Sequence, residues 1–287
     1  MGIKHNVSYR SGENMAKKTD EELYDVAMNT IGSVAKLPVI RVDREAFLRQ
    51  QFADSEYLDE ILEHGPQHVY TVESLRRKAD GVIKKSTNQT TLAAFVAGIP
   101  GGPAAVAAGS ADVAQYFGFA INLAQKIAYL FGEDDLFTDE SELNEGAKVR
   151  VLAYLGVMLG ASGSAMLVGK LAREVGKNMG KKITQQALTK TAWYPLLKKI
   201  GAMVGKRVVK ESVGKAVTKV VPVVGGAISG AITYAMFKPM GGRLADVLVR
   251  NLNGEFDETG MELRPEFRKA EPSEDGEATI HAIEIDG

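Results

Sequence analysis

The chain lacks cysteine, and among its 287 residues it has only four histidines and one tryptophan. Structural disulfides and cysteine-ligated metal sites are therefore excluded, and the composition is compatible with a reducing cytoplasm. The scarcity of histidine leaves few side chains for nucleophilic or general-base catalysis. The first ten residues are polar and have no apolar run, so we expect no secretory signal there.

The common phosphate-binding and acyl-transfer motifs are also missing. Residues 163–170 come nearest to a P-loop, but the spacing is one residue too long and Leu171 replaces the hydroxyl residue. Residues 160–163 do not match the GxSxG nucleophile elbow. We therefore expect no catalytic residues and no cofactor, and we favour a protein that is not an enzyme.

Two groups of residues could hold a metal ion, and neither has a fitting pattern. His64 and His68 are four residues apart, but Gly65 and Pro66 interrupt the helix that would align them. The acidic stretch 133–142 does not have the spacing of an EF-hand loop and suits the first turn of a helix equally well. We expect no metal site.

The patterns that are present predict helices. Thr19 and Glu22 form a capping box, and Asp43 offers a second N-cap. Pro100, Gly101, Gly102 and Pro103 form a PGGP hinge, because proline and glycine cannot readily continue a helix. One helix should end near residue 99 and another should run from about 103 to 131.

We predict an all-α fold, a compact Gly/Ala-rich helical bundle with a PGGP-hinged helical hairpin. A flexible N-terminus (1–18) precedes the helical domain (19–250). The remaining residues, 251–287, carry eleven acids against three bases, and we expect them to form a mostly disordered acidic tail.

Glycine is abundant, at 30 residues, and GxxxG recurs on predicted helices. Small residues four apart allow two helix backbones to approach closely. The four pairs are Gly156/Gly160, Gly176/Gly180, Gly201/Gly205 and Gly226/Gly230. Two uncharged runs, 151–169 and 220–237, are long enough to span a membrane but are diluted by small residues. They could be membrane spans or core helices of a soluble protein.

A narrow polar stripe runs along the helix predicted after the hinge, because Asp112, Gln115, Asn122 and Lys126 fall on one face. The stripe could be a buried hydrogen-bond network that sets the helix register. It could instead line a polar path or a ligand pocket, in which a buried Asp112 would have a raised pKa.

Positive charge is concentrated between residues 170 and 219, with thirteen bases against two acids. An amphipathic stretch, 195–221, could place its basic side chains against anionic lipid or a partner, or could be a solvated surface helix. The candidate contact residues are Lys198, Lys199, Lys206, Arg207 and Lys210. Nucleic acid is not expected as a partner, because no aromatic residues interleave with these bases.

The helix predicted after Pro239 has Arg243, Asp246 and Arg250 at i, i+3 and i+7. This spacing predicts a ladder of ion pairs along one helix face.

Three segments together resemble the EcsC protein family: LPVIRVDREAFL (37–48), IPGGPAAVAAGSADVAQYFGFAINLAQKIAYLFG (99–132) and VPVVGGAISGAITYAMFKPMG (221–241). The resemblance covers roughly residues 24–250, and the second segment is its most specific part. The family is named after a gene in an ABC-transporter operon and has no established biochemical role. The resemblance implies an all-α bacterial or phage-encoded protein that associates with membranes. It supplies no catalytic residues, and it marks Asp112 and the hinge as characteristic positions.

The first functional hypothesis is a non-enzymatic protein on the inner face of the cytoplasmic membrane, where it would assist a transport or secretion system. Its partner would be an anionic membrane surface or a membrane protein, with a homo-oligomer as a further option. The second hypothesis is a pore-forming or integral membrane component with the polar stripe facing the lumen. The third is a ligand-binding module or hydrolase that uses the Asp112 stripe as its pocket.

Overall fold

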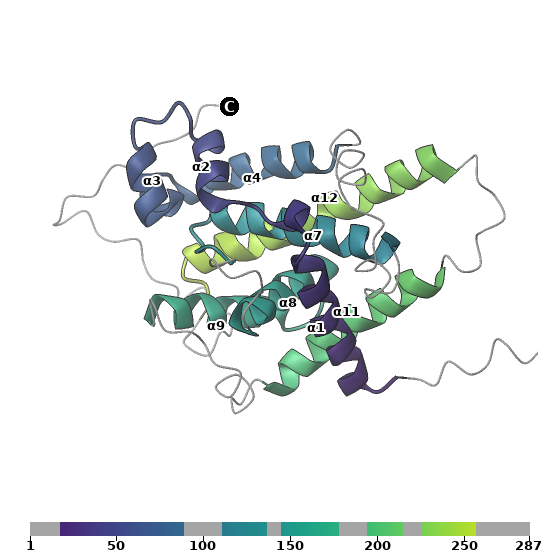
Figure 1. The fold of residues 1–287 in the computed structure, drawn as a ribbon. Coiled ribbons are helices and arrows are strands. Elements are labelled where there is room, and N and C mark those ends of the chain that lie inside the picture. Colours follow the sequence, from purple (N-terminus) through teal and green to yellow (C-terminus); the bar gives the residue numbers. More distant parts are fainter. Residues whose placement is uncertain (1–17, 89–110, 137–144, 178–193, 215–224, 257–287) are drawn as a thin grey trace, which may run out of the picture.

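The computed structural model describes residues 18–88, 111–136, 145–177, 194–214 and 225–256. This part of the chain is helical and contains no strand, which confirms the all-α class (Figure 1). The helices are α1 (Asp20–Ala35), η1 (Pro38–Ile40), α2 (Arg44–Gln51), α3 (Leu58–His64), η2 (Pro66–His68), α4 (Val72–Ser86), α7 (Ala111–Leu130), α8 (Glu145–Leu159), α9 (Ser164–Lys177), α11 (Tyr194–Gly214) and α12 (Gly225–Leu252).

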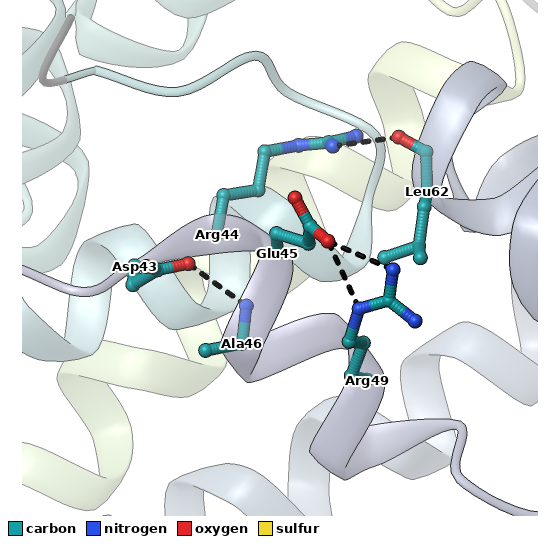
Figure 2. A network of polar contacts seen from close by, with 6 residues as sticks. All are labelled: Asp43, Arg44, Glu45, Ala46, Arg49 and Leu62. Carbon is teal, nitrogen blue, oxygen red and sulfur yellow. Dashed lines mark hydrogen bonds and ion pairs between the residues drawn. The ribbon is translucent and has the colours of Figure 1, made fainter. Parts of the chain in front are cut away.

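The predicted caps are confirmed at the starts of two helices. At α1, the Thr19 hydroxyl accepts a hydrogen bond from the Glu22 amide, and the Glu22 carboxylate accepts one from the Thr19 amide at 2.6 Å. At α2, the Asp43 carboxylate accepts a hydrogen bond from the Ala46 amide at 2.8 Å, as Figure 2 shows. These side chains satisfy amides that have no partner within the helix. Local residue chemistry therefore decides where both helices begin.

Helix α7 is the centre of the bundle. It packs against α1, α2, α4, α8, α11 and α12, and it crosses the middle of the molecule in Figure 1. From Phe117 to Leu130 most of its side chains are buried, and Phe119 meets the ring of Phe237 from α12 edge to face, 4.3 Å between centroids. A helix that is apolar on nearly every side can be accommodated only inside the protein. The organisation of the bundle around this segment follows from that composition.

Two glycines of the predicted GxxxG pairs permit a close helix crossing. Gly201 and Gly205 of α11 lie against α1, and an added Cβ would overlap the Tyr24 ring at the first position and the Leu23 carbonyl at the second. Gly160 has a different role, because it has φ +76° and a Cβ built there would meet no atom within 4 Å. It ends α8 in the left-handed conformation that favours glycine. Of the Gly156/Gly160 pair, only Gly156 meets a neighbouring helix, because a Cβ there would lie 2.6 Å from Cγ2 of Ile200 in α11.

Two sequence expectations are corrected by the helix boundaries. The uncharged run 151–169 does not form one helix, since α8 ends at Leu159 and α9 begins at Ser164, with Gly160 and Gly163 both at positive φ between them. Helix α12 does not begin after Pro239 but contains it. None of the helices in the described ranges combines the length and the apolar character that a bilayer crossing requires.

The PGGP hinge (100–103) and the residues after 256 lie outside the described part of the chain. The described fold nevertheless continues beyond residue 250. Phe256 is only 2% exposed, and its ring lies against Gly169 of α9. The packed domain therefore extends at least to Phe256.

Candidate functional site

The polar stripe on α7 contains a buried hydrogen-bond network. The Asn122 amide nitrogen donates to the carbonyl oxygen of Ile40 at 3.2 Å. Gln125 donates to the same carbonyl at 2.9 Å and accepts from the Val42 amide at 3.0 Å. These bonds give the Ile40 carbonyl and the Val42 amide side-chain partners, and they join α7 to the end of η1. Of the two stripe residues whose side chains are described, Asn122 therefore takes part in a structural network and Lys126 does not.

Gln125 was not among the predicted residues, although it lies three positions after Asn122 and is fully buried. That spacing places it on the same helix face, so the signal was available in the sequence. Asp112 and Gln115 belong to α7, but their side chains lie outside the described part.

Lys126, the last residue of the predicted stripe, has a different environment from Asn122. Burial, and secondly the neighbouring Lys85 of α4, lower the pKa of the Lys126 ammonium group. Both effects disfavour the charged form of a lysine. Lys126 therefore adds positive potential beside the C-terminal half of α4 rather than a hydrogen bond to the network.

A second polar cluster follows α7 at Glu133. Arg44 donates from Nε to the Glu133 carbonyl and from Nη1 to the Leu62 carbonyl, both at 3.1 Å, and Figure 2 shows the second of these bonds. The Glu133 carboxylate lies 3.7 Å from Nη1 of Arg150 in α8. Burial raises the pKa of Glu133, against the opposing effects of Arg150 and a hydrogen bond from Tyr154. The cluster joins the loop after α7 to α2, α3 and α8.

Neither group of possible metal ligands forms a site in the described ranges. The rings of His64 and His68 meet edge to face at 6.1 Å between centroids, which is a packing contact. No three acidic or histidine side chains gather closely enough there to hold a metal ion.

The basic residues of α11 that were predicted to face lipid or a partner have different environments in the structure. Lys198 is ion-paired with Glu21 of α1, at 3.0 Å between Nζ and Oε1. The Arg207 guanidinium turns inward over the Tyr116 ring of α7, 5.2 Å from its centroid. Lys199 and Lys206 are exposed, and the side chain of Lys210 lies outside the described part. Because α11 packs on α1 and α7, two of its basic side chains, Lys198 and Arg207, contact residues of those helices.

The residues of the predicted ion-pair ladder bind elsewhere. Asp246 pairs with Arg76 of α4, at 2.8 Å, rather than with its neighbours on α12. Arg243 donates to the carbonyl of Met158 in α8, and Arg250 pairs with Glu255. Arg243 and Asp246 thus contact α8 and α4, which pack against α12, whereas Arg250 pairs with a residue just beyond the end of α12.

Helices α4 and α12 border a cleft of about 560 Å³. It is lined by Arg76, Asp80, Ile83, Lys84, Lys238, Pro239 and Gly242. Its volume falls within the range of about 300–1,000 Å³ that is typical of small-molecule sites. The cleft therefore combines a small apolar surface with charged side chains from two helices, and it is the candidate site.

The charges of the cleft are of two kinds. Arg76 is held between Asp80 and Asp246, and although burial opposes it, their hydrogen bonds raise the pKa of Arg76. Its charge is therefore compensated within the protein. Lys84 and Lys238 are exposed, and neither ammonium group has an ion-pair or hydrogen-bond partner among the described residues. These two lysines are the charges that remain available to a ligand.

Comparisons of the chain with protein-family models, with curated proteins and with solved structures find no match.

Proposed function

We propose that this protein is a non-enzymatic helical protein of the EcsC type that binds peripherally to the anionic inner surface of the cytoplasmic membrane. The observation that carries the proposal is the pair of exposed lysines, Lys84 and Lys238, which line one cleft from two helices. Resemblance of the segments 37–48, 99–132 and 221–241 to the EcsC family supports the membrane setting.

Electrostatic attraction gives the expected size of the effect. A basic side chain near an anionic bilayer contributes about 1 kcal/mol to binding. Lys84 and Lys238 together would contribute about 2 kcal/mol, or about a 30-fold change in membrane partitioning. Screening by salt should weaken the binding, because both side chains are exposed to solvent.

The proposal can be tested by sedimentation with vesicles of phosphatidylglycerol and phosphatidylcholine, and with vesicles of phosphatidylcholine alone. The wild-type protein should bind the mixed vesicles, and Lys84→Glu/Lys238→Glu should not. The matched control is Lys199→Glu/Lys206→Glu, which makes the same charge change on α11 and should retain most of the binding.

Three results would contradict the proposal. The wild-type protein could fail to bind anionic vesicles, its binding could be insensitive to salt, or the two double variants could bind equally. Circular dichroism of each variant checks that the helical fold is retained.

A further inference from the structure

The floor of the α4–α12 cleft is apolar and closely packed. Ile83 of α4 is only 2% exposed. Gly241 brings α12 against it, because a Cβ at this position would lie 2.8 Å from Cγ1 of Ile83. The exposed Pro239 ring has no N–H and adds further apolar surface. This floor cannot donate hydrogen bonds to an anion, so it suits the hydrocarbon part of a ligand.

The next residue, Gly242, borders open space. No atom lies within 4 Å of a Cβ built at Gly242, although the residue lines the cleft. A side chain placed there would enter the cleft without displacing the protein. Occupancy of the cleft can therefore be blocked without changing any charge.

The two available charges line the same cleft from different helices, Lys84 from α4 and Lys238 from α12. Lysine ammonium groups are flexible point charges that bind phosphate oxygens. Arg76 does not compete for the ligand, because Asp80 and Asp246 already occupy its guanidinium. The ligand that fits has one anionic group joined to an apolar portion.

We propose that this cleft binds the headgroup of a single anionic phospholipid, with its phosphate near Lys84 and Lys238 and its glycerol and first methylene groups on the exposed Pro239 ring. The inference rests on the proposed membrane association and adds a defined lipid site to it. Free inorganic phosphate would use only the lysines and leave the apolar floor uncovered.

The test uses dioctanoyl phosphatidylglycerol below its critical micelle concentration, with the full-length protein and isothermal titration calorimetry. Gly242→Leu should weaken binding at least tenfold, because the leucine fills the cleft while both lysines remain. The matched control is Gly81→Leu, an exposed glycine of α4 with open space around it that does not line the cleft. It should bind as the wild type does.

Two further probes identify the chemistry that is recognised. Inorganic phosphate at the same concentration and dioctanoyl phosphatidylcholine should each give no binding. Equal binding of either probe, or equal binding of Gly242→Leu and wild type, would overturn the lipid site. Melting temperatures without lipid confirm that both glycine variants are folded.

Failure of this inference can be separated from failure of the proposed function. Wild-type protein that sediments with anionic vesicles but does not bind the short-chain lipid would refute the defined site alone. Wild-type protein that binds the short-chain lipid but not vesicles would refute membrane association alone.

Discussion

The hydrogen bonds that connect α7 to η1 make a quantitative prediction about stability. The carbonyl oxygen of Ile40, a fully buried residue, accepts from both Asn122 and Gln125. The buried amide of Val42 donates only to Gln125 in this network. Each of two single substitutions, Asn122→Ala and Gln125→Leu, leaves the Ile40 carbonyl with one donor. The double variant leaves it with none.

The magnitudes follow from which group loses its partner. Gln125→Leu keeps the side-chain volume but leaves the Val42 amide buried without a partner, which costs about 1–3 kcal/mol. Asn122→Ala should cost about 0.5–1.5 kcal/mol, because Gln125 still satisfies the carbonyl. The double variant should be less stable than the sum of the two by about 1–2 kcal/mol, since the carbonyl is then unsatisfied.

Urea denaturation followed by circular dichroism measures the three free energies of unfolding. Gln50→Leu, which changes an exposed glutamine of α2, is the control and should stay within about 0.5 kcal/mol of the wild type. Additivity of the two substitutions within about 0.5 kcal/mol would refute the argument that they share one buried acceptor.

Two further predictions concern Gly205 and Lys126. Gly205→Ala should lower the free energy of unfolding by about 1–3 kcal/mol, because the added Cβ would overlap the Leu23 carbonyl. Gly242→Ala should raise the free energy of unfolding by about 0.5–1 kcal/mol, because its Cβ would enter open space and alanine favours a helix over glycine. Equal melting temperatures of the two variants would contradict this reasoning. Lys126→Met should raise the melting temperature at neutral pH, because it removes a charge whose burial is unfavourable. The wild type gains stability as the pH rises from the lowered pKa of Lys126 towards the ordinary lysine pKa. The difference in melting temperature between Lys126→Met and the wild type should therefore shrink over that pH range. A difference that does not change with pH would contradict this prediction.

The start of a helix was predictable where its signal is local. Thr19 and Asp43 cap α1 and α2 as their neighbours in the sequence indicated, because a cap acts on amides two or three residues away. In α4, Leu75, Ala79 and Val82 recur at helical spacing and are all buried, because residues three or four apart share one helix face. The role of Gly160 was not predictable from GxxxG spacing alone, because a helix end and a helix crossing both favour glycine.

Spacing along one helix could not predict which basic side chains make contacts within the protein and which are left to bind a ligand. Lys198 and Arg207 looked equivalent to Lys199 and Lys206 in the sequence, yet the first two make contacts with α1 and α7. The cleft lysines, Lys84 and Lys238, come from helices far apart in the chain and gave no common motif. The candidate site therefore came from the packing of α4 on α12.

The amino-acid sequence by itself determined the helical class, the capped starts of α1 and α2, and the central position of an apolar α7, because these depend on near neighbours and on burial. Only the tertiary structure decided which charges are compensated and which are left to meet a ligand. Arg76 and Asp246 are 170 residues apart and Lys198 and Glu21 are 177 apart. Ion pairing depends on distance in space, and that distance is set by how the helices pack.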